Sequence, residues 1–207
     1  MSFKKLKPEV VEALKTIPIE SLTTTANTFF SNIKSGKNVL ISAPVSSGKT
    51  TTALVSIFNK VNQEYEGSPR AILLTDTIEK AETLHKKITP VCRKLDVTAD
   101  LIHDKGNSIQ QRNDIFDGTE IIIGNPKRIF ELYLQNGINL KLLDLFIVDD
   151  LDECLSNHKQ AELKRLIESL ESKTQLVLLT NVYSKKVETF VESLEIPLTI
   201  IETDDSL

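Results

Sequence analysis

Short apolar runs alternate with segments of helical spacing from Asn38 to the end of the chain. Most of these runs are continuously apolar, which is typical of strands that helices cover on both faces. Strands that alternate with helices predict an α/β domain whose sheet is mostly parallel and twisted. The seven runs expected to form strands are residues 38–43, 71–76, 97–103, 120–125, 143–150, 175–180 and 198–203.

The segments between these runs carry apolar residues three and four positions apart, as amphipathic helices do. Clear cases are residues 78–88, 126–137 and 161–172. Pro126 suits a first helical turn and Gly137 suits the end of that helix, whereas Pro90 is expected to end or kink its segment. Before the first strand, residues 8–14 and 19–34 are also expected to be helical, although a run of three threonines weakens the second.

Length and composition indicate one globular domain. The chain has 207 residues, of which 40% are hydrophobic and 26% are charged, so a disordered, fibrous or collagen-like chain is excluded. At about 150 residues per domain, one core is the simplest arrangement, and no low-complexity linker divides the chain. We therefore expect a single domain over residues 1–207, with an N-terminal helical segment, residues 1–37, packed on it.

Charge and hydropathy restrict the expected location and partners. No apolar run approaches the length of about 18 residues that spans a bilayer, and the first residues lack the features of a secretory signal. The protein is therefore expected to be cytoplasmic, without a membrane partner. The net charge of −4 gives no global electrostatic argument for nucleic acid binding, so any such contact must be local.

The cysteine and histidine patterns do not indicate a metal centre or a nucleophile. Cys92 and Cys154 are too few for a disulfide framework and have no ligand spacing, so we expect buried, inert thiols and no zinc site. His85, His103 and His158 show no metal or triad spacing, and we interpret them as ordinary surface or core imidazoles.

The strongest chemical motif is APVSSGKT, which lies between an expected strand and an expected helix. It matches the phosphate-binding pattern GxxxxGKT except at its first residue, Ala43, which replaces glycine. Gly48 permits close backbone approach to phosphate, Lys49 supplies a cation, and Thr50 can place its hydroxyl on Mg²⁺. The alternative is a chance loop without a ligand. The residues expected to contact the nucleotide are Ala43, Pro44, Val45, Ser46, Ser47, Gly48, Lys49, Thr50 and Thr51.

A second motif, LFIVDDLDE, is an apolar strand that ends in carboxylates, at the place where a Walker B element is expected. Asp149 would hold Mg²⁺ directly or through water, and Asp150 would stand where the water-activating carboxylate is expected. The alternative is a helix cap after a buried strand, because aspartate is a favoured cap. The candidate catalytic residues are thus Lys49, Asp149 and Asp150, the candidate metal ligands are Thr50 and Asp149, and the expected cofactors are ATP or ADP and Mg²⁺.

These two motifs and several weaker segments, in the same order along the chain, resemble the first RecA-like domain of DEAD-box RNA helicases in superfamily 2. The segments DTIEKA, NPKR, DDLD and TNV resemble the family patterns PTRELA, TPGR, DEAD and SAT, at residues 76–81, 125–128, 149–152 and 180–182. The region of Lys105 and Gly106 resembles the glycine doublet. The resemblance covers nearly the whole chain and implies a RecA-like P-loop NTPase fold.

The resemblance also implies further binding residues. Phe3 resembles the upstream aromatic residue that stacks on adenine. Single-stranded RNA would be gripped through its phosphate backbone by the loops that carry Thr77, Gly106, Pro126, Lys127 and Arg128. The alternative for the two cations is an ordinary solvated first turn of a helix.

Several positions depart from the family pattern, and each changes an expected property. Ala26 stands where the adenine-reading glutamine should be, so selectivity for ATP over GTP is placed in question. Val45 and Ser46 replace threonine and glycine, so phosphate binding should persist with a less flexible loop. Asp150 replaces the DEAD glutamate and retracts the carboxylate by about one methylene, and Val182 lacks a hydroxyl. Hydrolysis is therefore expected to be feeble, because a displacement of about 1 Å can cost on the order of a hundredfold.

The chain stops soon after the SAT-like segment, so no second RecA-like domain, with its arginine finger and its half of the RNA clamp, is expected. The first hypothesis is a stand-alone ATP-binding domain that binds single-stranded RNA weakly and does not unwind it alone. Its ATPase would be weak or dependent on a protein that supplies the missing half. The alternatives are a non-catalytic, helicase-like interaction module, and a P-loop kinase, which the NPKR segment and the absence of an arginine-rich lid disfavour.

Overall fold

The computed structural model describes residues 6–19, 21–64, 68–156 and 159–203. In these residues seven strands form one sheet in the order β3-β4-β2-β5-β6-β1-β7, and every neighbouring pair is parallel. This confirms the predicted α/β architecture. The strands are β1 (Val39–Ser42), β2 (Ala71–Leu74), β3 (Ala99–Ile102), β4 (Ile121–Gly124), β5 (Leu145–Val148), β6 (Gln175–Thr180) and β7 (Thr199–Glu202).

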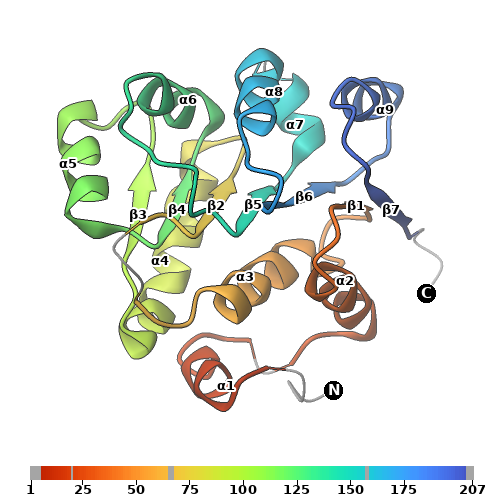
Figure 1. Ribbon diagram of the computed structural model, residues 1–207. Coiled ribbons are helices and arrows are strands. Elements are labelled where there is room, and N and C mark those ends of the chain that lie inside the picture. Colours follow the sequence, from red (N-terminus) through yellow and green to blue (C-terminus); the bar gives the residue numbers. More distant parts are fainter. Residues whose placement is uncertain (1–5, 20, 65–67, 157–158, 204–207) are drawn as a thin grey trace.

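Helices cover both faces of the sheet (Figure 1). They are α1 (Pro8–Leu14), α2 (Thr24–Lys34), α3 (Lys49–Lys60), α4 (Ile78–Leu95), α5 (Ser108–Gly118), α6 (Pro126–Leu134), α7 (Leu151–Ser156), α8 (Gln160–Glu168) and α9 (Lys185–Glu192). In the view of Figure 1, α1 to α4 lie below the sheet and α5 to α9 lie above it. None of the helices in the described residues is long and apolar enough to cross a membrane.

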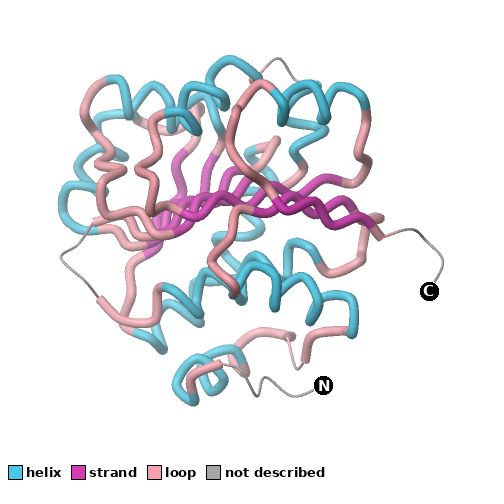
Figure 2. Tube along the Cα trace, turned by 45° about the vertical axis from the view of Figure 1, so that its right-hand side comes forward, coloured by secondary structure: helices cyan, strands magenta, loops and turns pink. Residues whose placement is uncertain are grey.

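The sheet is buried between these two layers, and Figure 2 shows it nearly edge-on. Alternate residues of a strand point to opposite faces. Leu73 and Ile147 therefore belong to the core below the sheet, and Ile72 and Phe146 belong to the core above it. This two-sided burial explains why the strands read as continuous apolar runs, because both faces of each central strand meet a helical layer.

Pro90 was expected to end or kink its segment, and it does not end it, because α4 continues to Leu95. Proline in a helix interior removes one hydrogen bond and costs about 3 kcal/mol. Pro90 is exposed, whereas Ile88, Val91 and Leu95 on the same helix are buried in the core. Burial of this apolar face beyond the proline offsets the local cost.

Helix α2 begins at Thr24, five residues later than the predicted start at residue 19. Thr23 is its N-cap, and the side-chain oxygen accepts a hydrogen bond from the backbone N–H of Ala26 at 3.1 Å. The threonine run that weakened the predicted helix therefore determines where the helix starts, because threonine oxygens satisfy the free N–H groups of a first turn. Helix α2 packs on α3 and β1, and α1 packs on α4.

Candidate functional site

The candidate nucleotide site lies where strands β5, β6 and β1 end, side by side, at the carboxyl edge of the sheet. Open α/β sheets bind ligands at this edge because the loops that follow neighbouring parallel strands meet there. Here the loops border a cavity of about 460 Å³. The cavity is lined by Val45, Ser46, Gly48, Lys49, Thr50, Thr51, Lys80, Asp150 and Asn181.

The phosphate-binding loop turns sharply between β1 and α3 through two residues with positive φ. Gly48 has a φ of 95°, and a Cβ at this position would lie 2.9 Å from the Cβ of Ala26, so glycine is required. Ser46 has a φ of 66°, where the family pattern carries glycine. A residue with a side chain in this region carries a strain of about 1 kcal/mol. The loop is therefore built around one required glycine and one strained serine.

Lys49 is the first residue of α3 and is 5% exposed. Its ammonium donates hydrogen bonds to the carbonyl oxygens of Ala43 and of Pro44, the second at 2.7 Å, and lies 3.5 Å from Ser47 Oγ. Burial lowers the pKa of Lys49, against the opposing effect of the aspartates after β5. The loop's own carbonyls thus hold this cation at the cavity wall.

Asp149 directly follows β5 and is fully buried. Its Oδ2 accepts a hydrogen bond from Thr50 Oγ1 at 2.6 Å and lies 2.9 Å from the ammonium of Lys80. Its Oδ1 is also buried and has no hydrogen-bond partner in the described part of the chain. Two donors therefore contact Oδ2 of this carboxylate, whereas Oδ1 is available to a ligand.

Asp150 has a positive φ of 54°, a region that aspartate tolerates better than most residues. Its carboxylate forms an ion pair with Lys80, and its Oδ1 lies 3.4 Å from the side-chain nitrogen of Asn181. Asn181 belongs to the SAT-like segment, in which the Thr180 hydroxyl donates to the Val182 carbonyl at 2.9 Å. The structure therefore places the SAT-like segment TNV against the DDLD segment.

Lys80 was missed by the sequence reasoning, although it is the cation closest to the paired aspartates. It lies in the first turn of α4, whose N-cap Thr77 accepts a hydrogen bond from the Lys80 backbone N–H at 3.2 Å. Burial by itself lowers the pKa of Lys80, but Asp149 and Asp150 outweigh it, so the pKa is raised. The available signal was in the DTIEKA segment, where lysine stands in place of the leucine of PTRELA.

The oxygen donors at the cavity wall and beside it fit Mg²⁺. The ion prefers oxygen ligands and usually takes only one or two from the protein, the rest being waters and substrate phosphates. The Thr50 hydroxyl and the Asp149 carboxylate supply such oxygens side by side, and Asp149 Oδ1 has no other partner. In the described residues no group of three or more histidine, cysteine, aspartate or glutamate side chains gathers as metal ligands. A phosphate-assisted Mg²⁺ site does not need one.

A second cavity, of about 450 Å³, lies on the other side of the loop and shares Ser46, Gly48 and Thr51 with the first. Its remaining lining residues are Pro18, Ile19, Ser21, Leu22, Thr23, Ala26 and Lys87. Ala26 is 1% exposed, so the expected position of the adenine-reading glutamine is filled by a methyl group. Phe3, the expected adenine-stacking residue, lies outside the described residues.

The residues expected to bind RNA form a second group, after strands β2, β4 and β3, which are neighbours in the sheet. Thr77 caps α4, and Pro126 begins α6 and is buried. Lys127 is well exposed, with 57% of its side chain accessible, and lies 3.7 Å from the carboxylate of Asp104. Among the predicted RNA-binding cations, Lys127 is the one that faces solvent.

Arg128 is held inside the protein, with only 12% of its side chain accessible. Its guanidinium donates to the carbonyl oxygens of Asp104 at 3.0 Å and Gly106 at 3.3 Å. A hydrogen bond from the side chain of Asn125 lowers the pKa of Asp104, and a backbone hydrogen bond and the charges of Lys127 and Arg128 add smaller effects in the same direction. Arg128 therefore fastens the Gly106 loop to the start of α6.

Both cysteines are buried and form no disulfide bond with each other. Burial raises the pKa of each thiol, that of Cys92 and that of Cys154, to about 12, so the thiolate is scarce at neutral pH. The ring of His85 bonds the carbonyl oxygen of Ala99 at 2.8 Å through Nε2. His103 Nδ1 is buried without a hydrogen-bond partner in the described residues, and His158 lies outside them.

Sequence relatives match most of the chain. An ATP-dependent RNA helicase eIF4A from Scheffersomyces stipitis is 28% identical over 206 residues, 98% of this chain and 51% of the relative. The DEAD-box ATP-dependent RNA helicase rde-12 from Caenorhabditis elegans is 26% identical over 170 residues, 78% of this chain and 18% of the relative. The chain thus spans about half the length of the eIF4A relative and a smaller share of rde-12.

Solved structures share the fold. Saccharomyces cerevisiae Dbp5 bound to Gle1 and IP6 superposes with a TM-score of 0.84 at 20% identity, over 99% of this chain and 52% of that chain. A DEAD box protein from the hyperthermophile Methanococcus jannaschii superposes with a TM-score of 0.83 at 19% identity, over 99% of this chain and 56% of that chain. The RecA-like fold expected from the resemblance is therefore confirmed.

The DEAD/DEAH box helicase family model matches residues 23–190. This range contains all the segments that carry the resemblance, from the phosphate-binding loop to TNV, and the structure gathers APVSSGKT, DDLD and TNV around one cavity. The chain belongs to the DEAD/DEAH box helicase family.

Proposed function

We propose that this chain is a cytoplasmic DEAD-box-like domain that binds ATP or ADP with Mg²⁺ at the cavity beside β1. The observation that carries the proposal is the contact of 2.6 Å between Thr50 Oγ1 and Asp149 Oδ2. It joins two segments 99 residues apart, which hold phosphate and Mg²⁺ in P-loop proteins. The buried cation Lys49 and the amino terminus of α3 add positive charge where the phosphates would lie.

In this proposal Lys49, Thr50, Asp149 and Asp150 have different roles. Lys49 and the backbone N–H groups of the loop bind the phosphates, and Thr50 and Asp149 hold Mg²⁺, which neutralises charge on the β- and γ-phosphates when bound. Asp150 orients the attacking water. Its short side chain is already paired with Lys80 and with the Asn181 amide, so hydrolysis by this domain alone is feeble.

We assign weak, sequence-independent binding of single-stranded RNA to the three loops after β2, β3 and β4. Thr77, Gly106 and Pro126 would approach the phosphate backbone through hydroxyl and backbone groups, and Lys127 would contribute an exposed cation. Arg128 would act mainly by holding the Gly106 loop in place. Few free cations and a net charge of −4 support low affinity.

The proposed activity needs a second polypeptide or domain. An arginine finger supplied from outside contributes about 10³- to 10⁵-fold in related phosphoryl transfer. The eIF4A relative is about twice as long as this chain, and the solved Dbp5 structures include Gle1 and, in one case, Nup159. A protein partner that completes the helicase half would thus raise both ATPase and RNA affinity.

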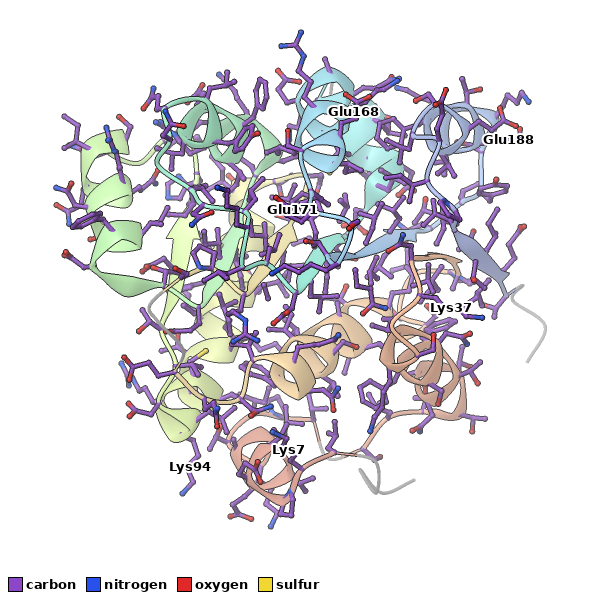
Figure 3. The ribbon with its side chains drawn as sticks, in the orientation of Figure 1. Lys7, Lys37, Lys94, Glu168, Glu171 and Glu188 are labelled. Carbon is purple, nitrogen blue, oxygen red and sulfur yellow. The ribbon has the colours of Figure 1, made fainter. Side chains whose placement is uncertain are left out.

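Nucleotide titration tests the proposal. Lys49→Ala is expected to weaken ADP binding at least about tenfold, because it removes charge-assisted hydrogen bonds to phosphate. The matched control is Lys37→Ala, an exposed lysine at the opposite end of β1, labelled in Figure 3, and it should bind ADP like the wild type. Equal affinities for Lys49→Ala and the wild type would refute nucleotide binding at this loop.

A second candidate function, a non-catalytic interaction module, is supported by an exposed apolar surface on α5. Phe116 is 89% exposed and Ile109 is 71% exposed, and both line a hollow with Arg112. Exposed aromatic residues of this kind are frequent in protein interfaces. This candidate is favoured if the wild type binds neither ADP nor RNA in the titrations.

A further inference from the structure

Two neighbouring carboxylates of the nucleotide site share one internal cation. The ammonium of Lys80 lies 2.9 Å from Asp149 Oδ2 and forms an ion pair with Asp150 Oδ2. Asp149 is fully buried, and the side chains of Lys80 and Asp150 are 25% and 20% exposed. No other ion pair to either aspartate occurs in the described residues. The charge that compensates this acidic pair therefore comes from the protein itself.

The backbone of α4 places Lys80 beside the two aspartates. The residue lies in the first turn of α4, which the Thr77 side chain caps. Because β2 and β5 are neighbours in the sheet, the start of α4 stands directly beside the end of β5. In the segment DTIEKA, the matching place of the pattern PTRELA is leucine, so the cation is a property of this chain and not of that pattern.

The oxygen of Asp149 that Lys80 contacts is also the one that lies beside the hydroxyl of Thr50. Asp149 Oδ2 also accepts the Thr50 hydroxyl at 2.6 Å, and these are the two protein groups suited to hold Mg²⁺. An ammonium on that oxygen repels a divalent cation a few ångströms away, and the repulsion is strong where water is scarce. Bringing Mg²⁺ directly to this oxygen, beside the Thr50 hydroxyl, requires Lys80 to move away or the ion to bind through water.

We propose that Lys80 is a built-in cation that takes over the charge-neutralising role of Mg²⁺ beside Asp149 and Asp150. Nucleotide binding by this chain therefore depends little on Mg²⁺. The inference rests on the proposed nucleotide site, and it adds that the cation beside Asp149 and Asp150 is a side chain of the protein. Lys80 lines the same cavity as Lys49 and Thr50, so a terminal phosphate in that cavity meets two ammonium groups instead of one.

Calorimetric titration of ADP in Mg²⁺ and in EDTA tests the role of Lys80. For the wild type we expect the two affinities to differ by less than about threefold, and for Lys80→Met by more than about tenfold. Lys80→Arg keeps the charge and should resemble the wild type. Lys86→Met removes an exposed lysine from the same helix and should also resemble it. The same Mg²⁺ dependence in Lys80→Met and the wild type would overturn the inference.

Two further measurements separate this inference from the proposed nucleotide site. Lys80→Met leaves buried Asp149 without its counter-charge and can lose stability, so Lys80→Gln, which keeps an N–H donor without the charge, is tested beside it. Mn²⁺ binding to the nucleotide-free proteins is followed by electron paramagnetic resonance. Tighter Mn²⁺ binding by the uncharged variants than by the wild type supports the inference. If, in addition, none of the proteins binds ADP, the proposed function is refuted and the assignment of Lys80 as the internal cation still stands. Equal Mn²⁺ binding overturns the inference.

Discussion

Two lysines of one cavity contact different kinds of oxygen. Lys49 donates to backbone carbonyls of its own loop, whereas Lys80 contacts the carboxylates of Asp149 and Asp150. A carbonyl oxygen carries only a partial charge, so it holds an ammonium less strongly than a carboxylate does. An incoming phosphate can therefore attract Lys49 away from its carbonyls, while Lys80 remains with the aspartates.

The base of the nucleotide should be read poorly. The second cavity, which Ala26 lines, has the buried methyl group of this residue where an amide would read the base, and Ala26 packs against Gly48. Strong discrimination requires buried polar groups that the wrong ligand leaves unpaired. We expect the affinities for ADP and GDP, measured by competition against a fluorescent nucleotide, to agree within about tenfold.

Adenosine and guanosine without phosphates serve as controls for this prediction and should bind far more weakly than either diphosphate. A preference for ADP over GDP of a hundredfold or more, on the order of 3 kcal/mol, would mean that other groups in this cavity read the base.

At the scale of elements, the two loops after β3 and β4 are tied together by side chains. Asn125 caps α6, accepting the Arg128 N–H at 3.2 Å, and donates to the Asp104 carboxylate at 2.8 Å. Arg128 adds hydrogen bonds from α6 to the carbonyls of Asp104 and Gly106. The loops after β3 and β4 therefore form one connected surface beside the start of α4.

Lys127 and Arg128 should affect RNA binding in different ways. Lys127→Ala should weaken binding to all homopolymers about equally and reduce the salt slope by about one, because it removes an exposed phosphate contact. Arg128→Ala should also weaken binding for all sequences, and in addition should lower the unfolding free energy by about 1 to 3 kcal/mol, because two loop carbonyls lose their donor. Fluorescence anisotropy at two salt concentrations and thermal unfolding measure these effects.

The wild-type dissociation constants should be no tighter than about 10⁻⁴ to 10⁻⁶ M at physiological salt. Lys37→Ala, at the opposite edge of the sheet, is the control and should bind RNA normally. Absence of salt-sensitive binding, or RNA binding unchanged by Arg128→Ala, would instead favour the non-catalytic interaction module.

At the scale of the whole molecule, the strand order divides the carboxyl edge of the sheet into two parts. The ends of β5, β6 and β1 carry the proposed nucleotide site, and the ends of β3, β4 and β2 carry the proposed RNA surface. Helix α4 begins between them, with Thr77 on the RNA side and Lys80 on the nucleotide side. The two proposed sites are thus linked through a single helical turn.

The isolated domain should turn over ATP more slowly than about 1 s⁻¹, the low end of the range for working enzymes. The reason is the combined loss of carboxylate reach at Asp150 and of an arginine finger. Phosphate release is measured with and without single-stranded RNA, and Lys49→Ala gives the background. A steady-state rate at or above about 1 s⁻¹ for the isolated chain would contradict this prediction.

Much of the fold could be predicted because it depends on local patterns. Continuous apolar runs located the seven strands, and the phosphate-binding loop and the DDLD aspartates were identifiable from short motifs with fixed spacing. The errors were also local. Pro90 lies inside α4, and Thr23 starts α2 instead of interrupting a longer helix, because packing of an apolar face and satisfaction of free N–H groups outweighed intrinsic propensity.

The sequence by itself determined the class of fold and the residues suited to phosphate and Mg²⁺, because periodicity and motif spacing are properties of adjacent residues. Only the tertiary structure decided that Lys80 faces Asp150, 70 residues away, and that Arg128 is turned into the protein while Lys127 faces solvent. Those contacts depend on β2 lying beside β5 and β3 beside β4. Strand order arises from the packing of the whole sheet, and the periodicity of the separate segments carries no information about it.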